Sequence, residues 1–247
     1  MLKYLLSGRR LIMTPLVLLA AAAMCGLGVW QLNRYNQRMA LNDHINSQMA
    51  AEPLAITGAA VDPDELDYRR VAVRGTFDQS QEILLRNRSY QGTTGYHLLT
   101  PLRLSGSDHA VLVDRGWIPL TEASPEQRAA FAPPAGEVEV IGVARRSQEQ
   151  TGPQDPPLGP DRPRLDAWFR ISIPRIQQQV SYPLLPVFIE MQFGPETELS
   201  LPIPGTTSDL GPGSHLSYVI QWFSFALIAV VGYIALMNQQ RKKETRG

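Results

Sequence analysis

Two long uncharged apolar stretches lie at opposite ends of this chain, and they constrain its fold more than any other feature. The first covers residues 11–30 and the second covers residues 216–237. Each has the length of roughly 20 residues that an α-helix needs to cross the hydrocarbon core of a bilayer. We therefore predict two transmembrane helices, with the residues between them folded on one side of one membrane.

Basic residues gather on the outer flanks of both stretches: Lys3, Arg9, Arg10, Arg241, Lys242, Lys243 and Arg246. Because cytoplasmic flanks collect Lys and Arg, residues 1–10 and residues 238–247 are predicted to be cytoplasmic tips. Residues 31–215 then form an extracytoplasmic domain. Both ends of this domain are tethered to the cell (inner) membrane.

The net charge of the chain is zero because two opposite charges cancel. The two tips carry seven basic residues and one acidic residue, a net charge of +6, whereas residues 31–215 carry 16 arginines and 22 acidic residues, a net charge of −6. A negatively charged domain repels the phosphates of nucleic acids, which excludes DNA and RNA as partners. The domain has roughly 185 residues, which is enough for one buried core.

The first apolar stretch also has features of a cleaved signal peptide. A basic start, an apolar run and the alanines at positions 20–23 fit such a signal. Against cleavage, apolar character continues through Leu27 and Val29, and residues 30–49 follow with no Gly or Pro and with helical spacing of apolar residues. We therefore favour a retained span that continues as a helix until Pro53 ends it.

After Tyr68 the pattern changes to short alternating runs separated by Gly, Asn, Asp and Ser, which is typical of strands in a meander. Strands are predicted at residues 71–77, 81–86, 96–104, 110–118, 137–143, 168–173 and 187–193. Short helices are predicted at residues 125–131, after the N-cap Ser124, and at residues 174–180. Residues 148–163 are predicted to be a Pro-rich loop, and residues 194–213 a linker. Since no βαβ rhythm is present, we predict a mainly β (α+β) domain, an antiparallel barrel or sandwich.

Common catalytic and metal-binding motifs are absent from the sequence. It contains no G-x-S-x-G, H-E-x-x-H, C-x-x-C or G-x-G-x-x-G motif and no Walker loop. Asp62, Asp64, Glu65 and Asp67 lack the spacing of a calcium loop, so a solvated turn is expected there. An extracytoplasmic hydrolase is therefore disfavoured, and the chain is not expected to be an enzyme.

Three local sequences stand out instead. They are G-V-W-Q-L-N-R at residues 28–34, V-L-V-D-R-G-W-I-P at residues 111–119 and H-L-S-Y-V-I-Q-W-F at residues 215–223. Each has a structural explanation when taken alone. Trp30 and Trp222 suit an aromatic belt at a membrane interface, and the middle sequence suits a bend with a packed tryptophan.

Together with Y-x-R-V-x-V-x-G-x-F at residues 68–77 and G-x-x-G-Y-H-x-x-T-P-L at residues 92–102, these sequences resemble the Surfeit locus protein 1 family. The resemblance covers nearly the whole chain, including the two-span layout. The chain has Arg38 where the family often has Lys, and Val219 where Ala is usual. Both departures are conservative.

The resemblance implies a membrane-anchored assembly factor for haem-copper cytochrome c oxidase. The factor assists insertion of haem a into subunit I, as a haem-binding chaperone. Subunit I and the haem a synthesis machinery are the implied partners. The alternative is a protein-binding scaffold that stabilises immature subunit I and binds no haem.

The family's proposed haem ligand corresponds to His215 in this chain, and a neutral imidazole is a normal axial ligand of haem iron. Tyr218 and Trp222 follow His215 at i+3 and i+7, so we predict that all three lie on one helix face. Trp30 and Arg34 lie at the same membrane level on the first span, where Arg34 is suited to pair with a propionate. The alternative is that the aromatic face only packs against the other span.

Overall fold

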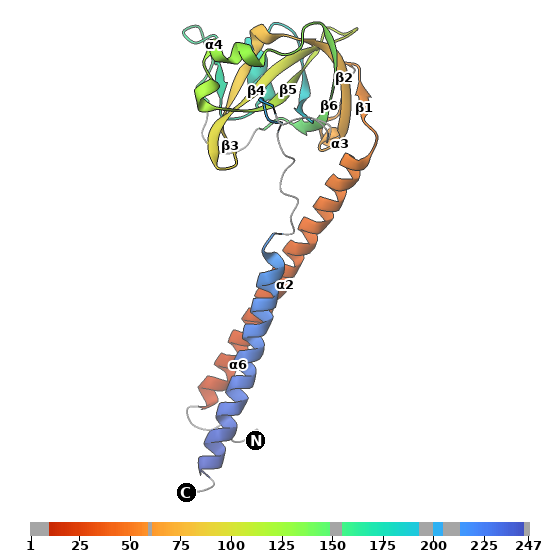
Figure 1. The fold of residues 1–247 in the computed structure, drawn as a ribbon. Helices are drawn as coiled ribbons and strands as arrows, with labels where there is room; N and C mark the ends of the chain where they lie inside the picture. The colour runs from red at the N-terminus through yellow and green to blue at the C-terminus, as the bar shows by residue number, and fades with distance from the viewer. Residues whose placement is uncertain (1–9, 59–60, 149–154, 193–199, 205–212, 245–247) are drawn as a thin grey trace. The chain divides into compact units, whose positions relative to one another are not determined.

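The computed structural model describes residues 10–58, 61–148, 155–192, 200–204 and 213–244 (Figure 1). The chain divides into two compact units. The first, the helix pair, comprises Met1–His44 and Asp209–Gly247, and the second, the barrel unit, comprises Ile45–Ser208. The outermost parts of the predicted tips and parts of the predicted loop and linker lie outside the described residues.

Two long helices dominate the first unit. Helix α2 covers Arg10–Ala50 and helix α6 covers His215–Glu244, and both are long and apolar enough to cross a membrane. The predicted helix at residues 30–49 is confirmed, and it continues from the apolar stretch without a break. With a rise of 1.5 Å per residue, α2 is roughly 60 Å long, about twice the thickness of a hydrocarbon core.

Helices α2 and α6 lie side by side in an antiparallel pair (Figure 1). Buried and half-buried positions recur every three or four residues along each helix. On α2 they include Thr14, Val17, Ala21, Met24, Gly28, Gln31 and Tyr35, and on α6 His215, Val219, Trp222, Ala226, Ala229, Tyr233 and Met237. This spacing is the seam of a left-handed coiled coil. A hydrogen bond of 2.6 Å between the Thr14 and Tyr233 hydroxyls joins the helices at one end of the seam.

Five strands of the second unit close into a barrel in the order β2, β6, β8, β5, β4, and β4 pairs back to β2. Their bounds are β2 Arg70–Phe77, β4 Thr93–Leu104, β5 Ala110–Pro119, β6 Glu137–Arg146 and β8 Leu184–Met191. Three further strands extend the sheet, namely β1 Leu54–Ile56 on β2, β3 Ile83–Tyr90 on β4 and β7 Ala167–Trp168 on β3.

The barrel prediction is confirmed, but the prediction of a purely antiparallel sheet is wrong. Strands β5 and β8 pair in parallel, as do β1 with β2 and β3 with β7. Strands joined by tight turns must be antiparallel, whereas a long connection allows parallel pairing. More than 60 residues separate the end of β5 from the start of β8, so β8 is free to enter the barrel in the same direction as β5.

Short helices connect the strands: α3 Pro63–Leu66, η1 Gln79–Gln81, η2 Leu120–Glu122, α4 Pro125–Arg128, η3 Ala129–Phe131, α5 Ile173–Ile176 and η4 Gln177–Gln179. The predicted helices after Ser124 and Ile173 are confirmed, and the Ser124 hydroxyl accepts a hydrogen bond from the Gln127 N–H at 3.3 Å. The acidic run contains one helical turn, capped by the Asp62 side chain.

The predicted strand at residues 168–173 is wrong beyond Trp168. Only Ala167 and Trp168 pair with β3. Ile171 and Ile173 instead join an apolar cluster with Trp168 on the outer face of the barrel. Burial of these two isoleucines in the cluster takes the place of pairing with a strand.

Apolar side chains pack against both faces of β5. Val111 and Val113 belong to the cluster that fills the barrel, whereas Leu112 joins the outer cluster with Phe188. Side chains alternate between the two faces of a strand, so both sets of positions on β5 are covered. The D-R-G-W sequence that ends this strand is consequently buried as well.

Candidate functional site

His215 is the first residue of α6, and its ring contacts α2. The ring nitrogen Nδ1 lies 2.9 Å from the side-chain oxygen Oε1 of Gln31. The His215 side chain is half-buried, and Gly213 lies beside the edge of the ring that carries Nε2. The site residue selected from the sequence is therefore anchored through one ring nitrogen.

Trp222 and Tyr218 differ in their surroundings. Trp222 is half-buried on the seam, and its ring makes an edge-to-face contact with Phe225 at 6.2 Å between centroids. Tyr218 lies at the flank of the seam and is 45% exposed. Because the seam follows positions 215, 219, 222 and 226, Val219 occupies the place between His215 and Trp222 on the packed face.

Trp30 and Arg34 lie on the exposed side of α2. The Trp30 side chain is 52% exposed, and the guanidinium carbon of Arg34 lies 5.9 Å from the centroid of its ring. Arg34 also donates a hydrogen bond of 3.4 Å to Gln37. The residue of α2 that reaches His215 is Gln31, which the sequence analysis did not select although it lies inside one of the three sequences. The sequence signal that could have identified Gln31 is its position in the series of α2 residues that recur at intervals of three and four and face α6.

The sequence D-R-G-W on β5 places an ion pair inside the barrel unit. Arg115 Nη1 lies 2.9 Å from Glu82 Oε2, and the two side chains are 7% and 6% exposed. The Thr100 hydroxyl donates to the same carboxylate at 2.8 Å, and Arg115 donates to the Phe131 carbonyl. Burial lowers the pKa of Arg115, and the nearby Glu82 carboxylate opposes this shift. The pair has a structural role in the barrel.

The other residues of D-R-G-W fix the end of β5. Gly116 has a φ of +124°, and a Cβ atom there would collide with the Ile203 carbonyl. The Trp117 N–H donates to the Ile203 carbonyl at 2.5 Å, and its indole N–H donates to the Arg88 carbonyl at 3.3 Å. Glycine is required at position 116 because the backbone of Ile203 and Pro204 lies too close to leave room for a side chain.

Polar side chains form a row across the outer face of the barrel, on β4, β5, β8 and β6 in that order. His97 Nδ1 lies 2.8 Å from Asp114 Oδ2. Asp114 is opposite Glu190 in the parallel ladder, and Arg145 donates to both oxygens of Glu190 at 3.3 Å. Burial raises the pKa of Glu190, the Arg145 guanidinium opposes this rise, and the Asp114 carboxylate adds to it.

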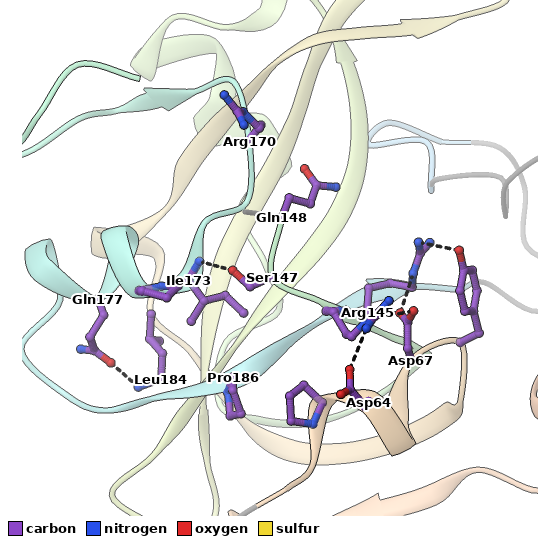
Figure 2. Close-up of a pocket in the computed structure, with 14 residues that line it drawn as sticks. Asp64, Asp67, Arg145, Ser147, Gln148, Arg170, Ile173, Gln177, Leu184 and Pro186 are labelled. Atoms are coloured by element: carbon purple, nitrogen blue, oxygen red, sulfur yellow. Dashed lines mark hydrogen bonds and ion pairs between the residues drawn. The ribbon is translucent and has the colours of Figure 1, made fainter. Parts of the chain in front are cut away.

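The row ends at an open cleft of about 920 Å³ in the barrel unit (Figure 2). Figure 2 shows Arg145 beside Asp64 and Asp67 on one wall, with Ile173 and Leu184 on the opposite wall. Arg146 also lines the cleft. Arg146 Nη1 lies 2.6 Å from Asp64 Oδ1, and Arg145 Nε lies 3.3 Å from Asp67 Oδ1. These basic side chains are thus neutralised by acids of the same wall.

The described part of the chain contains no metal site built from several protein side chains. Among these residues, no group of three or more His, Cys, Asp and Glu side chains is arranged to hold a metal ion. Haem iron, however, needs only one imidazole from the protein as an axial ligand. His215 has a half-buried imidazole ring.

This chain is similar to proteins of one family over most of its length. The model of the SURF1 family matches residues 18–227. A SURF1-like protein from Monosiga brevicollis is 31% identical over 225 residues, covering 87% of this chain and 83% of that protein. A SURF1-like protein from Drosophila melanogaster is 30% identical over 226 residues, covering 85% and 72%. Surfeit locus protein 1 from Homo sapiens is 27% identical over 233 residues, covering 88% and 74%.

Proposed function

This chain belongs to the SURF1 family, and from that premise we propose that it is a membrane-anchored assembly factor for haem-copper cytochrome c oxidase. In this role it holds haem a before the cofactor enters subunit I. The machinery that synthesises haem a supplies the cofactor, and immature subunit I receives it.

The proposed topology places α2 and α6 in the cell (inner) membrane and the barrel unit on the extracytoplasmic side. Two observations support it. Both helices are long and apolar enough to span a bilayer, and the basic residues of the chain ends flank them on one side only. The barrel unit then faces the side from which it can contact the extracytoplasmic surface of the oxidase.

The observation that carries the haem proposal is the hydrogen bond between His215 and Gln31 at the end of the seam. It anchors the imidazole by one nitrogen and leaves the other to act as an axial ligand. Haem supplies an iron centre that accepts a nitrogen ligand, and a flat apolar ring with two anionic propionates. The exposed aromatic rings of Trp30 and Tyr218 suit the apolar ring, and Arg34 suits a propionate.

Purification of the full chain from cells that make haem a tests this proposal. The wild type should carry a Soret band, and His215→Ala should lose or shift that band while its membrane level stays normal. His109→Ala is the matched control, because His109 is a half-buried histidine of the barrel unit that pairs with Asp108. An unchanged spectrum in His215→Ala would remove His215 from the site.

A non-haem scaffold for immature subunit I is the second candidate function. The open cleft of the barrel unit favours it, because a concave surface with both apolar and charged walls suits a protein partner. If the scaffold is the whole function, the wild type should lack haem, and His215→Ala should still co-purify with subunit I and support normal oxidase levels.

A further inference from the structure

The contact between His215 and Gln31 specifies where the proton of the imidazole lies. A neutral imidazole carries one N–H donor and one nitrogen with a lone pair. The atom of Gln31 that faces Nδ1 is the amide oxygen, at 2.9 Å, and an amide oxygen can only accept. With the Gln31 amide in this orientation, a neutral His215 ring carries its proton on Nδ1 and its lone pair on Nε2.

Packing of the two helices holds Gln31 in place. Gln31 and His215 both occupy seam positions. One turn before Gln31, Gly28 is buried, and a Cβ atom there would lie 3.0 Å from the ring of Phe223. The absence of a side chain at Gly28 lets α6 approach closely enough for the short reach of a glutamine amide.

The surroundings of Nε2 differ from those of Nδ1. A Cβ atom at Gly213 would lie 3.8 Å from Nε2 and 3.5 Å from the adjacent ring carbon. Gly213 has a φ of +67°, a conformation that favours glycine over other residues. Because Gly213 has no side chain, residue 213 places no Cβ atom against this edge of the ring.

We propose that Gln31 is a positioning residue that holds His215 in the Nδ1–H tautomer, so that Nε2 is the atom that binds haem iron. The identity of the ligand rests on the function proposed above, whereas the tautomer does not. Histidines that bind metals through one nitrogen commonly donate the other N–H to an acceptor, and that bond fixes the ring orientation and raises the basicity of the ligand.

The first test measures the tautomer in the haem-free full chain. Histidine labelled with ¹⁵N, in protein reconstituted into lipid nanodiscs, gives different NMR shifts for protonated and unprotonated ring nitrogens. The chain has four histidines, so His215→Ala assigns the signal. The wild type should show a protonated Nδ1 and an unprotonated Nε2. Gln31→Leu should lose this preference, and Gln31→Glu should keep it because a carboxylate also accepts.

Gln37→Leu is the matched control, because it makes the same change on the exposed side of α2. It should leave the tautomer unchanged. A wild type with its proton on Nε2, or a Gln31→Leu variant with an unchanged tautomer, would overturn the inference.

The second test titrates haem a into the same variants and follows the Soret band. Gln31→Leu should weaken binding by about 10- to 100-fold, the usual cost of losing such a supporting contact, and Gln31→Glu should restore it. The two tests separate the proposals. If the tautomer behaves as expected but no variant binds haem, the proposed function fails and Gln31 keeps its role. If haem binding needs His215 but Gln31→Leu binds normally, the role of Gln31 fails.

Discussion

Single residues inside the barrel unit differ greatly in how much they contribute to its stability, and Arg115 illustrates the extreme. Its guanidinium and the Glu82 carboxylate are both nearly inaccessible to water. Two buried charges stabilise the fold weakly as a pair, but removal of one leaves the other buried without full compensation. Arg128 Nη1 lies 3.6 Å from the other oxygen of Glu82 and replaces part of the lost contact.

Arg115→Leu should lower the free energy of unfolding by about 3–5 kcal/mol, because Glu82 stays buried with only Arg128 nearby. Urea unfolding followed by tryptophan fluorescence measures the loss. Arg74→Leu is the control, since Arg74 forms an ion pair with Glu139 in which the two side chains are 72% and 48% exposed. That variant should lose about 0–1 kcal/mol. Equal losses in the two variants would contradict the argument.

Glu190 gives the barrel unit a pH dependence with a definite sign. Because burial raises the pKa of Glu190 in the folded state, the folded chain binds this proton more tightly than the unfolded chain. Glu190 therefore contributes to the free energy of unfolding at pH values below its pKa in the unfolded chain, which is about 4.3. This contribution is lost as the pH rises through the pKa of Glu190 in the folded chain. Asp114, His97 and Arg145 face the same carboxyl group.

Glu190→Gln should remove this loss, so its urea midpoint should change less than that of the wild type as the pH rises above about 4.3. Unfolding curves at a series of pH values test this. Glu139→Gln removes a partly exposed carboxyl group and should keep the slope of the wild type. A wild type that gains stability relative to Glu190→Gln over this range would show that Arg145, rather than burial, governs the group.

Among the elements, the α2–α6 seam depends on small residues at a few positions. Gly28 is buried against Phe223, whereas Gly26, two residues earlier, has no heavy atom within 4 Å of where its Cβ would lie. Both glycines lie on α2, two residues apart, but only Gly28 occupies a seam position.

Gly28→Leu should therefore separate the helices, and Gly26→Leu should not. Thiol cross-linking between Thr14→Cys and Tyr233→Cys in a Cys25→Ala background measures helix proximity, since the two hydroxyls lie 2.6 Å apart in the wild type. The cross-linking yield should fall in Gly28→Leu alone. A similar yield in both glycine variants would mean that Gly28 does not set the distance between the helices.

Elements with a strong local pattern could be predicted from the sequence, whereas elements that depend on distant contacts could not. Strands β2 to β6 alternate clearly or end at turn residues, and the N-cap Ser124 indicates the helix that follows it. The three-residue strand β1 forms only because it can pair with the edge of β2. The parallel pairing of β5 with β8 depends on the path of the long connection between them. His215 was selected through the family resemblance. Its contact with Gln31 spans 184 positions, and no local pattern reports it.

At the scale of the whole molecule, the proposed topology assigns each part of the chain to one side of the membrane. Gly136 is an exposed turn residue just before β6, with no heavy atom within 4 Å of its Cβ position, so it should tolerate an insertion. The C-terminal tip, residues 238–247, contains the basic residues that end α6.

Alkaline phosphatase, which folds only outside the cytoplasm, should be active when inserted after Gly136 and inactive when fused after Gly247. The basic flanks of the two helices are the physical reason. A green fluorescent protein fusion at Gly247 is the complementary control and should fluoresce. Phosphatase activity at Gly247 would overturn the two-span topology, and a mature N-terminus inside α2 would show that the first apolar stretch is a cleaved signal.

The hydrogen bond between Gln31 and His215 also has a consequence for biosynthesis. A ribosome makes Gln31 early and His215 only after the entire barrel unit has been translated, 184 residues later. The imidazole reaches its amide partner only when α6 packs beside α2. Nascent or truncated chains that stop before α6 therefore possess a barrel but no completed His215 contact, and a chain gains that contact only after its barrel unit has been made.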